Sequence, residues 1–426
     1  MSKGNGIKSS LFGSAGIYMI TQVLNASIPF LLLPVITRYL SPEEFGIYSM
    51  FKVVSGLVFS IIGIGINGAI TRVYYDKNKG ELARYIANSF LLVTINSILM
   101  YLVFGLFTDF ISDKTYIPNN WLWTVILVSY GKVIFQATLV IWQVENKPFT
   151  YGAFQILQTT LNFTLNLWFI ISLNLNWTGA ILAETIAFFG FGILGFFFLL
   201  KNKWLKFKIS IQDIKHIISY GSPLIPHVVG MYVITASDRF LITALVGISE
   251  TGLYTVGYQI GMIIMILQDS FNKAWVPWLF SKLKQNNDFL KIKIVKFTYI
   301  YFVIIILAAL ILYALSPIIL QIMAGPAYQN ASQFILWLGL GYAFNGMYKM
   351  VTNYIFFDGR TYYLATITFI TAVINILISY ALIKLNGPIG AAQGTAISYL
   401  ISFFLTWYFS NVVYKMPWFN LRQKSN

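Results

Sequence analysis

A series of long apolar runs along the whole chain constrains its fold more than any other feature. The runs lie near residues 11–36, 46–70, 85–108, 121–143, 149–173, 178–200, 219–245, 252–276, 294–316, 333–357, 361–383 and 390–414. An α-helix needs about 20 residues to cross roughly 30 Å of hydrocarbon, so each run is long enough to span a membrane. The sequence therefore predicts an all-α integral membrane protein with about twelve transmembrane helices.

Composition supports this fold class and excludes several kinds of chemistry. Hydrophobic residues make up 58% of the 426 and charged residues 10%, and the mean hydropathy is +0.71. The chain has no Cys and two His, which excludes thiolate catalysts, Cys-based zinc sites and Fe–S clusters. It contains no P-loop, HExxH or nucleophile-elbow motif. We therefore expect no bound cofactor and no metal centre.

The distribution of Lys and Arg predicts the orientation. The net charge of +15 is typical of polytopic membrane proteins as well as of nucleic-acid binders, so it predicts no nucleic-acid partner. If the N-terminus is cytoplasmic, most of the 29 basic residues fall in cytoplasmic segments. The predicted outside loops hold only Arg38, Lys114 and Lys384. We therefore expect a multi-pass membrane protein with both termini in the cytoplasm.

The two halves of the sequence resemble each other. Residues 36–48 align with residues 242–254 at an offset of 206, and Gly179-Ala180 aligns with Gly390-Ala391 at an offset of 211. Six spans per half is an even number, so the repeats are parallel. This predicts an N-terminal six-helix lobe (1–200), a basic cytoplasmic linker between the lobes (201–218) and a C-terminal six-helix lobe (219–426).

The linker has the pattern of a short amphipathic helix. Ser210-x-x-Asp213 resembles a capping box, and Ile211, Ile214 and Ile218 follow at helical spacing. The basic residues around them could attract anionic lipid head groups, or they could simply satisfy the rule that fixes membrane orientation. Both interpretations remain open from the sequence.

Glycine motifs occur inside several predicted spans. GIGING at residues 63–68 and GFGILG at residues 190–195 match G-x-G-x-x-G, but no strand is predicted before either motif. Gly257-x-x-x-Gly261 and Gly390-x-x-x-Gly394 have the spacing of close helix contacts. We interpret all four as helix-packing motifs and not as dinucleotide sites.

Basic residues inside spans are the main functional candidates, because a charge facing lipid costs roughly 2.5–3.5 kcal/mol at the helix centre. Lys132 lies near the middle of its span, beyond the reach of snorkelling. It is expected to face a cavity or to pair internally with an acid such as Glu184. If Lys52, Arg239 and Lys349 face the same chamber, the four cations form a ladder able to hold a diphosphate.

Three acids in spans are candidates for binding a coupling proton or Na⁺: Glu184, Asp238 and Asp269. Asp269 is the weakest candidate, because Lys273 lies four residues later and a local ion pair is expected.

Three stretches of this sequence resemble the polysaccharide (O-antigen) flippases, the Wzx-type branch of the multidrug/oligosaccharidyl-lipid/polysaccharide exporter superfamily. They are LPVITRYLSPEEFGIY at residues 33–48, YGSPLIPH at 220–227 with SDRF at 237–240, and ETGLY at 250–254. The resemblance implies a V-shaped pair of six-helix lobes. It also implies ion-coupled alternating access that moves an undecaprenyl-diphosphate-linked oligosaccharide from the cytoplasmic to the periplasmic leaflet of the bacterial inner membrane.

The family's head-group contacts are cationic chamber residues. The resemblance places that role on Arg38 and Arg239, which lie in the matching stretches, and the span argument adds Lys52, Lys132 and Lys349. A polysaccharide polymerase and chain-length machinery are expected partners from the pathway, together with membrane lipids.

Two other functions remain open. A multidrug or cation antiporter of the same superfamily is expected to hold acids in its cavity, whereas the spans here carry five basic residues against three acids. A membrane polysaccharide polymerase or ligase needs a large outside loop, and the longest predicted loops, near residues 108–120 and 316–332, are short.

Overall fold

The computed structural model describes residues 17, 21, 23–25, 27, 28, 30–222, 224–360 and 362–420. Within these residues the chain forms helices and short connections, with no strand. A first helix runs over Val23–Tyr39 and includes residues outside the described set. The helices after it are α2 (Pro42–Ile62), α3 (Ile66–Val73), α4 (Lys79–Leu106), α5 (Thr108–Thr115), η1 (Asn119–Trp121), α6 (Leu122–Val144), α7 (Pro148–Leu167), η2 (Trp168–Ser172), α8 (Asn176–Lys201), α9 (Ile211–Gly221), α10 (Leu224–Leu245), α11 (Ile248–Leu283), α12 (Asp288–Met323), η3 (Pro326–Ala331), α13 (Ser332–Asp358), α14 (Tyr362–Asn386) and α15 (Ile389–Val413).

The predicted apolar runs coincide with these helices, and the first run, 11–36, lies partly outside the described residues. Among the residues that the structure describes, seven helices are long and apolar enough by themselves to cross a membrane: α2, α4, α6 with η1, α8, α12, α14 and α15. The helices α7, α10, α11 and α13 occupy the remaining predicted runs and carry more polar side chains. The chain is thus an all-α, multi-pass membrane protein, as predicted.

The second predicted run, 46–70, is divided in the structure. Gly63 caps α2, and Gly65 begins α3 with a left-handed φ of 60°. Ile64 between them also has a positive φ of 42°. Glycine adopts this conformation without a steric penalty, so this glycine motif ends one helix and starts the next.

The internal repeat falls on equivalent helix junctions. Ser41 caps the start of α2 and forms a capping box with Glu44. Gly247, 206 residues later, occupies the same position before α11. The local sequence similarity therefore marks the same helix–connection–helix unit in both halves.

Glycines at three of the predicted packing motifs bring helices into close contact. A Cβ built on Gly192 of α8 would lie 2.8 Å from the backbone of Gly131 in α6. A Cβ on Gly394 of α15 would lie 2.8 Å from Cα of Ser379 in α14. A Cβ on Gly257 of α11 would lie 2.9 Å from Cβ of Phe334 in α13. These contacts confirm the interpretation of the motifs as helix-packing sites.

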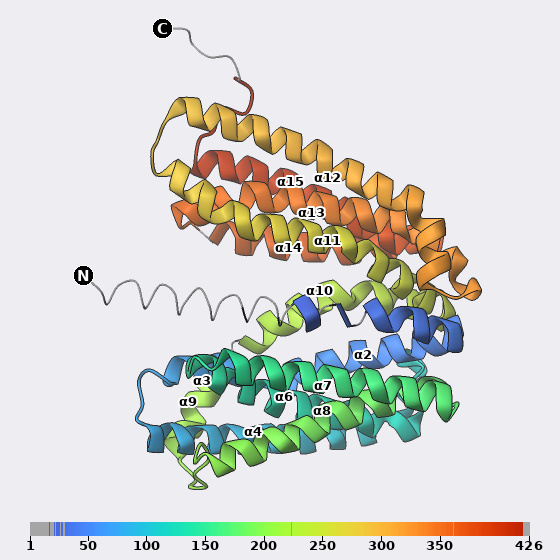
Figure 1. Ribbon diagram of the computed structural model, residues 1–426, viewed down its shortest axis with the longest axis vertical. Helices are drawn as coiled ribbons and strands as arrows, with labels where there is room; N and C mark the ends of the chain where they lie inside the picture. Colours follow the sequence, from blue (N-terminus) through green and yellow to red (C-terminus); the bar gives the residue numbers. More distant parts are fainter. Residues whose placement is uncertain are drawn as a thin grey trace. The chain divides into compact units, whose positions relative to one another are not determined.

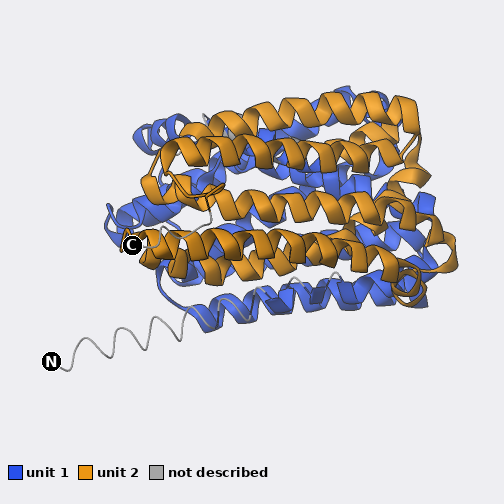
Figure 2. Cartoon of the chain, turned by 90° about the horizontal axis from the view of Figure 1, so that it is seen from above, with its two compact units in different colours: residues 1–236 blue, residues 237–426 orange. Residues whose placement is uncertain are grey.

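The chain separates into two compact units, residues 1–236 and 237–426, which Figure 2 shows in different colours. The boundary falls within α10 and not at the predicted linker, so α9 and the first part of α10 belong to the first unit. A hydrogen bond from Tyr232 Oη in α10 to the backbone oxygen of Lys52 in α2, at 3.3 Å, accounts for part of this association. The division into lobes 1–200 and 219–426 stays a prediction.

Each unit is a helix bundle (Figure 1). In the first unit, α6 packs against α2, α4 and α8, and α7 packs against α8. In the second, α13 packs against α11, α12 and α15, and α15 packs against α14. The central helices α6 and α13 carry Lys132 and Lys349, so the folding of each bundle determines where these cations lie.

Candidate functional site

The first unit brings together two lysines and one acid of the predicted set. Lys52 lies on α2, Lys132 on α6 and Glu184 on α8, and these three helices pack against one another. Glu184 is buried and accepts a hydrogen bond from Tyr48 Oη of α2 at 3.0 Å. Lys52 Nζ lies 5.2 Å from the centre of the Tyr48 ring. Tyr48 therefore links the carboxylate to one of the cations.

Lys132 lies in a slot between aromatic rings. It is near the middle of the 23-residue α6, and its Nζ lies 5.5 Å from the centre of the Phe59 ring and 5.2 Å from that of Phe188. The negative face of each ring attracts the ammonium group. The charges of Glu184 and Lys52 also act on it. The structure thus places two aromatic rings and the charges of Lys52 and Glu184 around a lysine near the middle of α6, and whether this lysine faces a cavity stays a prediction.

The close contact of α6 and α8 positions this slot. A Cβ on Gly131 would lie 2.6 Å from the backbone oxygen of Phe188, so only glycine allows the helices to approach so closely. This approach brings the Phe188 ring next to Lys132, the residue after Gly131. The glycine motif at residues 190–195 and the central lysine therefore belong to one structural feature.

The second unit surrounds the carboxylate of Asp238 with hydroxyl groups from three other helices. Asp238 of α10 is buried and accepts hydrogen bonds from Tyr254 Oη at 2.6 Å and Thr395 Oγ1 at 2.7 Å. Ser379 Oγ donates a longer one at 3.5 Å. These partners lie on α11, α15 and α14, respectively. Four helices therefore converge on one carboxylate.

An amide group adds to this oxygen-rich cluster. Ser237, the residue before Asp238, donates a hydrogen bond to Asn375 Oδ1 at 3.3 Å. Carboxylate, hydroxyl and amide oxygens form the kind of donor set that binds hard cations. A buried carboxylate can also carry a proton. The arrangement at Asp238 can therefore serve either coupling ion predicted from the sequence.

Arg239 contacts the ring of Tyr258, although it is adjacent to Asp238 in sequence. Its guanidinium carbon lies 4.2 Å from the centre of the Tyr258 ring. The Tyr258 ring packs edge-to-face on Tyr342 of α13, at 6.0 Å between centres. Consecutive helical residues point about 100° apart, which explains why the two neighbours contact different groups.

Lys349 and Asp269 form an ion pair between α13 and α11. The sequence analysis expected Asp269 to pair with Lys273 on its own helix, and the structure instead pairs it with Lys349. The reason is the packing of α11 against α13, which brings the partner helix within reach. The same seam contains a hydrogen bond from Gln268 Nε2 to Asn345 Oδ1, at 2.9 Å.

Arg38 is exposed at the end of the helix over Val23–Tyr39. Its Nη1 donates a hydrogen bond to the backbone oxygen of Pro34 at 2.9 Å. The structure therefore distributes the predicted cations over both units, with Arg38, Lys52 and Lys132 in the first and Arg239 and Lys349 in the second.

The sequence analysis did not identify the tyrosines that bind the buried acids. Tyr48 and Tyr254 are 206 residues apart, which is the offset of the repeat, and each donates its hydroxyl to a carboxylate. Glu184 and Thr395 are 211 residues apart, the second offset. A residue-by-residue alignment of the two repeats would have identified these tyrosines, because they occupy equivalent positions.

Known proteins resemble this chain in sequence over most of its length. A family model described as polysaccharide biosynthesis protein matches residues 11–284, more than half of the chain. The chain belongs to this family. Two proteins of Haemophilus influenzae are similar to this family member over most of both lengths. A protein of the Lsg locus is 22% identical over 86% of the chain and 90% of its own length. An uncharacterized membrane protein is 26% identical over 83% of the chain and 85% of its own length.

Solved structures show the same fold as this polysaccharide biosynthesis protein. An inward-facing multidrug resistance transporter of the MATE family, in the MOP superfamily, superposes with a TM-score of 0.74 and 13% identity. The match covers 93% of this chain and 97% of the other. The lipid II flippase MurJ in an inward closed conformation has a TM-score of 0.72 and 17% identity. The match covers 92% of this chain and 87% of MurJ. The chain therefore has the fold of MOP-superfamily transporters, and the family resemblance in the sequence is confirmed.

Proposed function

We propose that this protein is a flippase that moves an undecaprenyl-diphosphate-linked oligosaccharide, such as an O-antigen repeat unit, from the cytoplasmic to the periplasmic leaflet of the bacterial inner membrane. The observation that carries the proposal is Lys132, a cation held in the middle of a spanning helix between two aromatic rings. Membership of the polysaccharide biosynthesis family and the fold shared with MurJ support it.

The chemistry of the first unit suits a diphosphate. Lys132 and Lys52 bring two positive charges close enough to interact, with one negative charge, Glu184, near them. An arriving diphosphate relieves the repulsion between the lysines, and its attraction to them is stronger in a low-dielectric slot than in water. The aromatic rings hold the Lys132 ammonium in place before the anion binds.

The coupling ion is assigned to Asp238. Of the three candidate acids, Asp269 forms an ion pair with Lys349, and Glu184 lies near Lys132. Asp238 instead has hydroxyl groups from three helices and an amide nearby. Its oxygen donors favour a proton or Na⁺ that drives alternating access.

Transport can be tested in inverted inner-membrane vesicles loaded with the lipid-linked oligosaccharide. The measurement is the fraction of glycan that becomes protected from an impermeant glycosidase. We expect wild type to give protection, Lys132→Ala to lose most of it, and Lys132→Arg to retain part of it. Lys114→Ala, an exposed lysine of α5, is the matched control and should behave as wild type.

Equal protection by wild type and Lys132→Ala, at matched protein levels, would show that the central lysine does not bind the substrate. No protection by folded wild-type protein would contradict the flippase proposal itself. Uptake of organic cations would then favour the antiporter alternative.

The ion assignment has a separate test. Vesicles are given either a Na⁺ gradient or a pH gradient, and the rate of glycan protection is compared. We expect one gradient to accelerate wild type and Asp238→Asn to abolish that acceleration. If Asp238→Asn keeps the full response while Glu184→Gln loses it, the ion binds in the first unit instead.

A further inference from the structure

The segment that joins α8 to α10, residues 202–222, folds back along the first unit. It is called the linker below and consists of a stretch without helix up to Ser210 and then α9. The Phe207 ring lies 6.3 Å from the ring of Phe196, which is five residues before the end of the spanning helix α8. Five residues of helix correspond to about 7 Å. Phe207 therefore lies beside the last turns of a helix that is long and apolar enough to cross a membrane.

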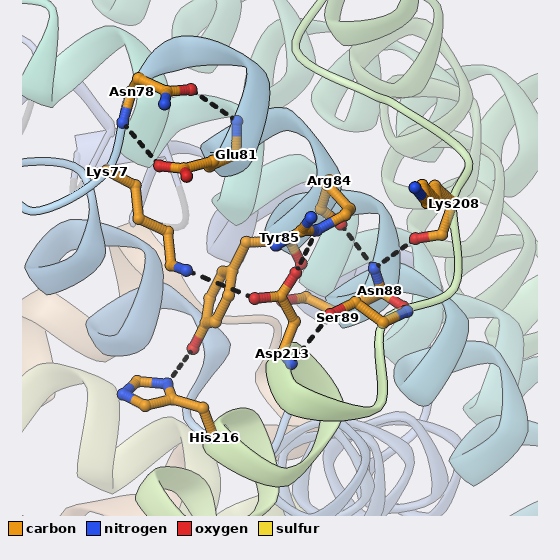
Figure 3. A network of polar contacts seen from close by, with 11 residues as sticks. Lys77, Asn78, Glu81, Arg84, Tyr85, Asn88, Ser89, Lys208, Asp213 and His216 are labelled. Atoms are coloured by element: carbon orange, nitrogen blue, oxygen red, sulfur yellow. Dashed lines mark hydrogen bonds and ion pairs between the residues drawn. The ribbon is translucent and has the colours of Figure 1, made fainter.

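An ion cluster fixes one face of α9 to the start of α4 (Figure 3). The buried carboxylate of Asp213 pairs with Arg84 Nε at 2.7 Å and with Lys77 Nζ at 3.4 Å. His216, one turn later, is hydrogen-bonded to Tyr85 Oη at 3.0 Å. The predicted capping box is half formed. Ser210 accepts a hydrogen bond from the Asp213 backbone, while the Asp213 side chain points to α4.

Backbone contacts hold the stretch before α9 against the same helix. Asn88 of α4 donates to the backbone oxygen of Lys208 at 2.9 Å and accepts from the backbone nitrogen of Ser210 at 3.1 Å. The backbone nitrogen of Lys206 donates to the oxygen of Ala83 at 3.1 Å. The linker is thus attached to the first unit over its central part, and its orientation is defined.

The opposite face of the linker is apolar and exposed. Phe207 is 69% exposed, Ile209 73%, Ile211 69% and Ile218 44%, whereas Ile217 is fully buried. In an extended chain, alternate residues point to the same side, so Phe207 and Ile209 lead into Ile211 at the start of α9. Large side chains in such a row are unusual next to water.

The linker is positively charged along its length. Five lysines lie in or beside the linker, and all of them are exposed: Lys201, Lys203, Lys206, Lys208 and Lys215. The one acidic residue between them, Asp213, is directed inward to Arg84 and Lys77. Apolar side chains flanked by lysines are typical of segments that lie in the interface of an anionic membrane.

We propose that the linker binds the anionic leaflet of the membrane on the side where α8 ends. Phe207, Ile209 and Ile211 enter the boundary between head groups and acyl chains, and the lysines contact lipid phosphates. The Asp213 cluster supports this binding by holding the apolar face outward. The proposal does not depend on which substrate the protein transports.

The absence of Cys from the sequence allows a direct test of depth. Single variants Ile209→Cys and Ile211→Cys of the full chain are spin-labelled and reconstituted into vesicles containing phosphatidylglycerol. Collision with oxygen reports on the lipid side, and collision with a water-soluble nickel chelate reports on the aqueous side. We expect both labels to favour oxygen. Gln212→Cys, an exposed polar neighbour, is the matched control and should favour nickel. Labels at 209 and 211 that are as accessible to nickel as the label at 212 would overturn the proposal.

The role of charge has its own test with the same labels. Vesicles of phosphatidylcholine alone are compared with vesicles that contain phosphatidylglycerol. We expect the anionic lipid to move the label at 209 deeper, and the triple variant Lys203→Gln, Lys206→Gln, Lys208→Gln to lose this change. A control triple in the second unit, Lys284→Gln, Lys293→Gln, Lys296→Gln, should retain it. Binding through the lysines of the linker would be excluded if the depth of the label at 209 did not change with anionic lipid. It would also be excluded if the linker triple variant and the control triple variant lost this change equally.

Discussion

At the residue scale, each unit contains a buried carboxylate that accepts a hydrogen bond from a tyrosine at the equivalent position of the repeat. In the first unit Tyr48 donates to Glu184, and in the second Tyr254 donates to Asp238. The acids lie on different helices of the repeat, α8 and α10. Their surroundings also differ, because Glu184 has Lys132 near it and Asp238 has hydroxyl groups. The two halves therefore share a hydrogen bond from tyrosine to carboxylate but differ in the charged and polar groups around the carboxylate.

The Tyr254 hydroxyl donates the shortest hydrogen bond to Asp238, so its removal tests the proposed ion site. Tyr254→Phe removes a hydrogen bond to a charged group, which contributes about 1.5–3 kcal/mol. We expect the concentration of coupling ion that gives half-maximal transport to change by about tenfold or more. The measurement is the initial transport rate across a series of ion concentrations. Tyr313→Phe, a partly exposed tyrosine of α12, should leave it unchanged, and an unchanged Tyr254→Phe would remove this hydroxyl from the site.

Charged residues were the part of the candidate site that the sequence could single out, and their roles stay predictions. A lysine in the middle of an apolar run is conspicuous because its cost in lipid is high, and the structure places two aromatic rings beside Lys132. Hydroxyl partners were not predictable in the same way. Thr395 and Ser379 are as common in helix packing as in ion sites, and only the folded bundle brings them to Asp238.

At the scale of helices, small residues decide how closely neighbouring elements approach. Spans could be predicted because a run of about 20 apolar residues has few alternatives in a membrane protein. The break between α2 and α3 was missed because a G-x-G-x-x-G motif can either pack helices or end one. The left-handed φ of Gly65 is a backbone property that the letters alone do not specify.

The contact between α14 and α15 provides a test at this scale. Gly394→Ala places a Cβ 2.3 Å from Ser379 Oγ, and the helices must separate. Overpacking of this kind costs about 1–3 kcal/mol, and separation moves the Thr395 hydroxyl away from Asp238. We expect a lower thermal unfolding midpoint in detergent and a weaker response to the coupling ion. Gly190→Ala on α8 is the matched control, because its Cβ meets nothing within 4 Å and should not destabilise the protein. Similar midpoints for the two variants would contradict the packing argument.

At the scale of the whole molecule, the Asp213 cluster makes stability depend on pH. Burial alone raises the pKa of Asp213, but the hydrogen bonds and positive charges of Arg84 and Lys77 outweigh it and hold the pKa below the ordinary value of 3.8. A carboxyl group whose pKa is lower in the folded state stabilises that state above its unfolded pKa. The stabilisation is lost as pH falls through the lower, folded pKa.

Asp213→Asn should therefore lower the thermal unfolding midpoint by a few degrees at pH 7, and the difference from wild type should shrink below about pH 4. Thermal unfolding in detergent between pH 7 and pH 3 measures this. Asp113→Asn makes the same charge change on exposed α5 and is the control. A difference that stays constant across this range would show that Asp213 acts through its shape and not through its charge.

Helix α10 begins in the first compact unit, and Asp238 lies on the part of it that belongs to the second, two residues after Ala236. The partners of its carboxylate come from α11, α14 and α15 of the same unit. A cation bound there would be held by groups of four helices at once, so ion binding and the folding of this unit should be thermodynamically linked. The free energy of unfolding of the second unit should then rise with the concentration of the coupling ion.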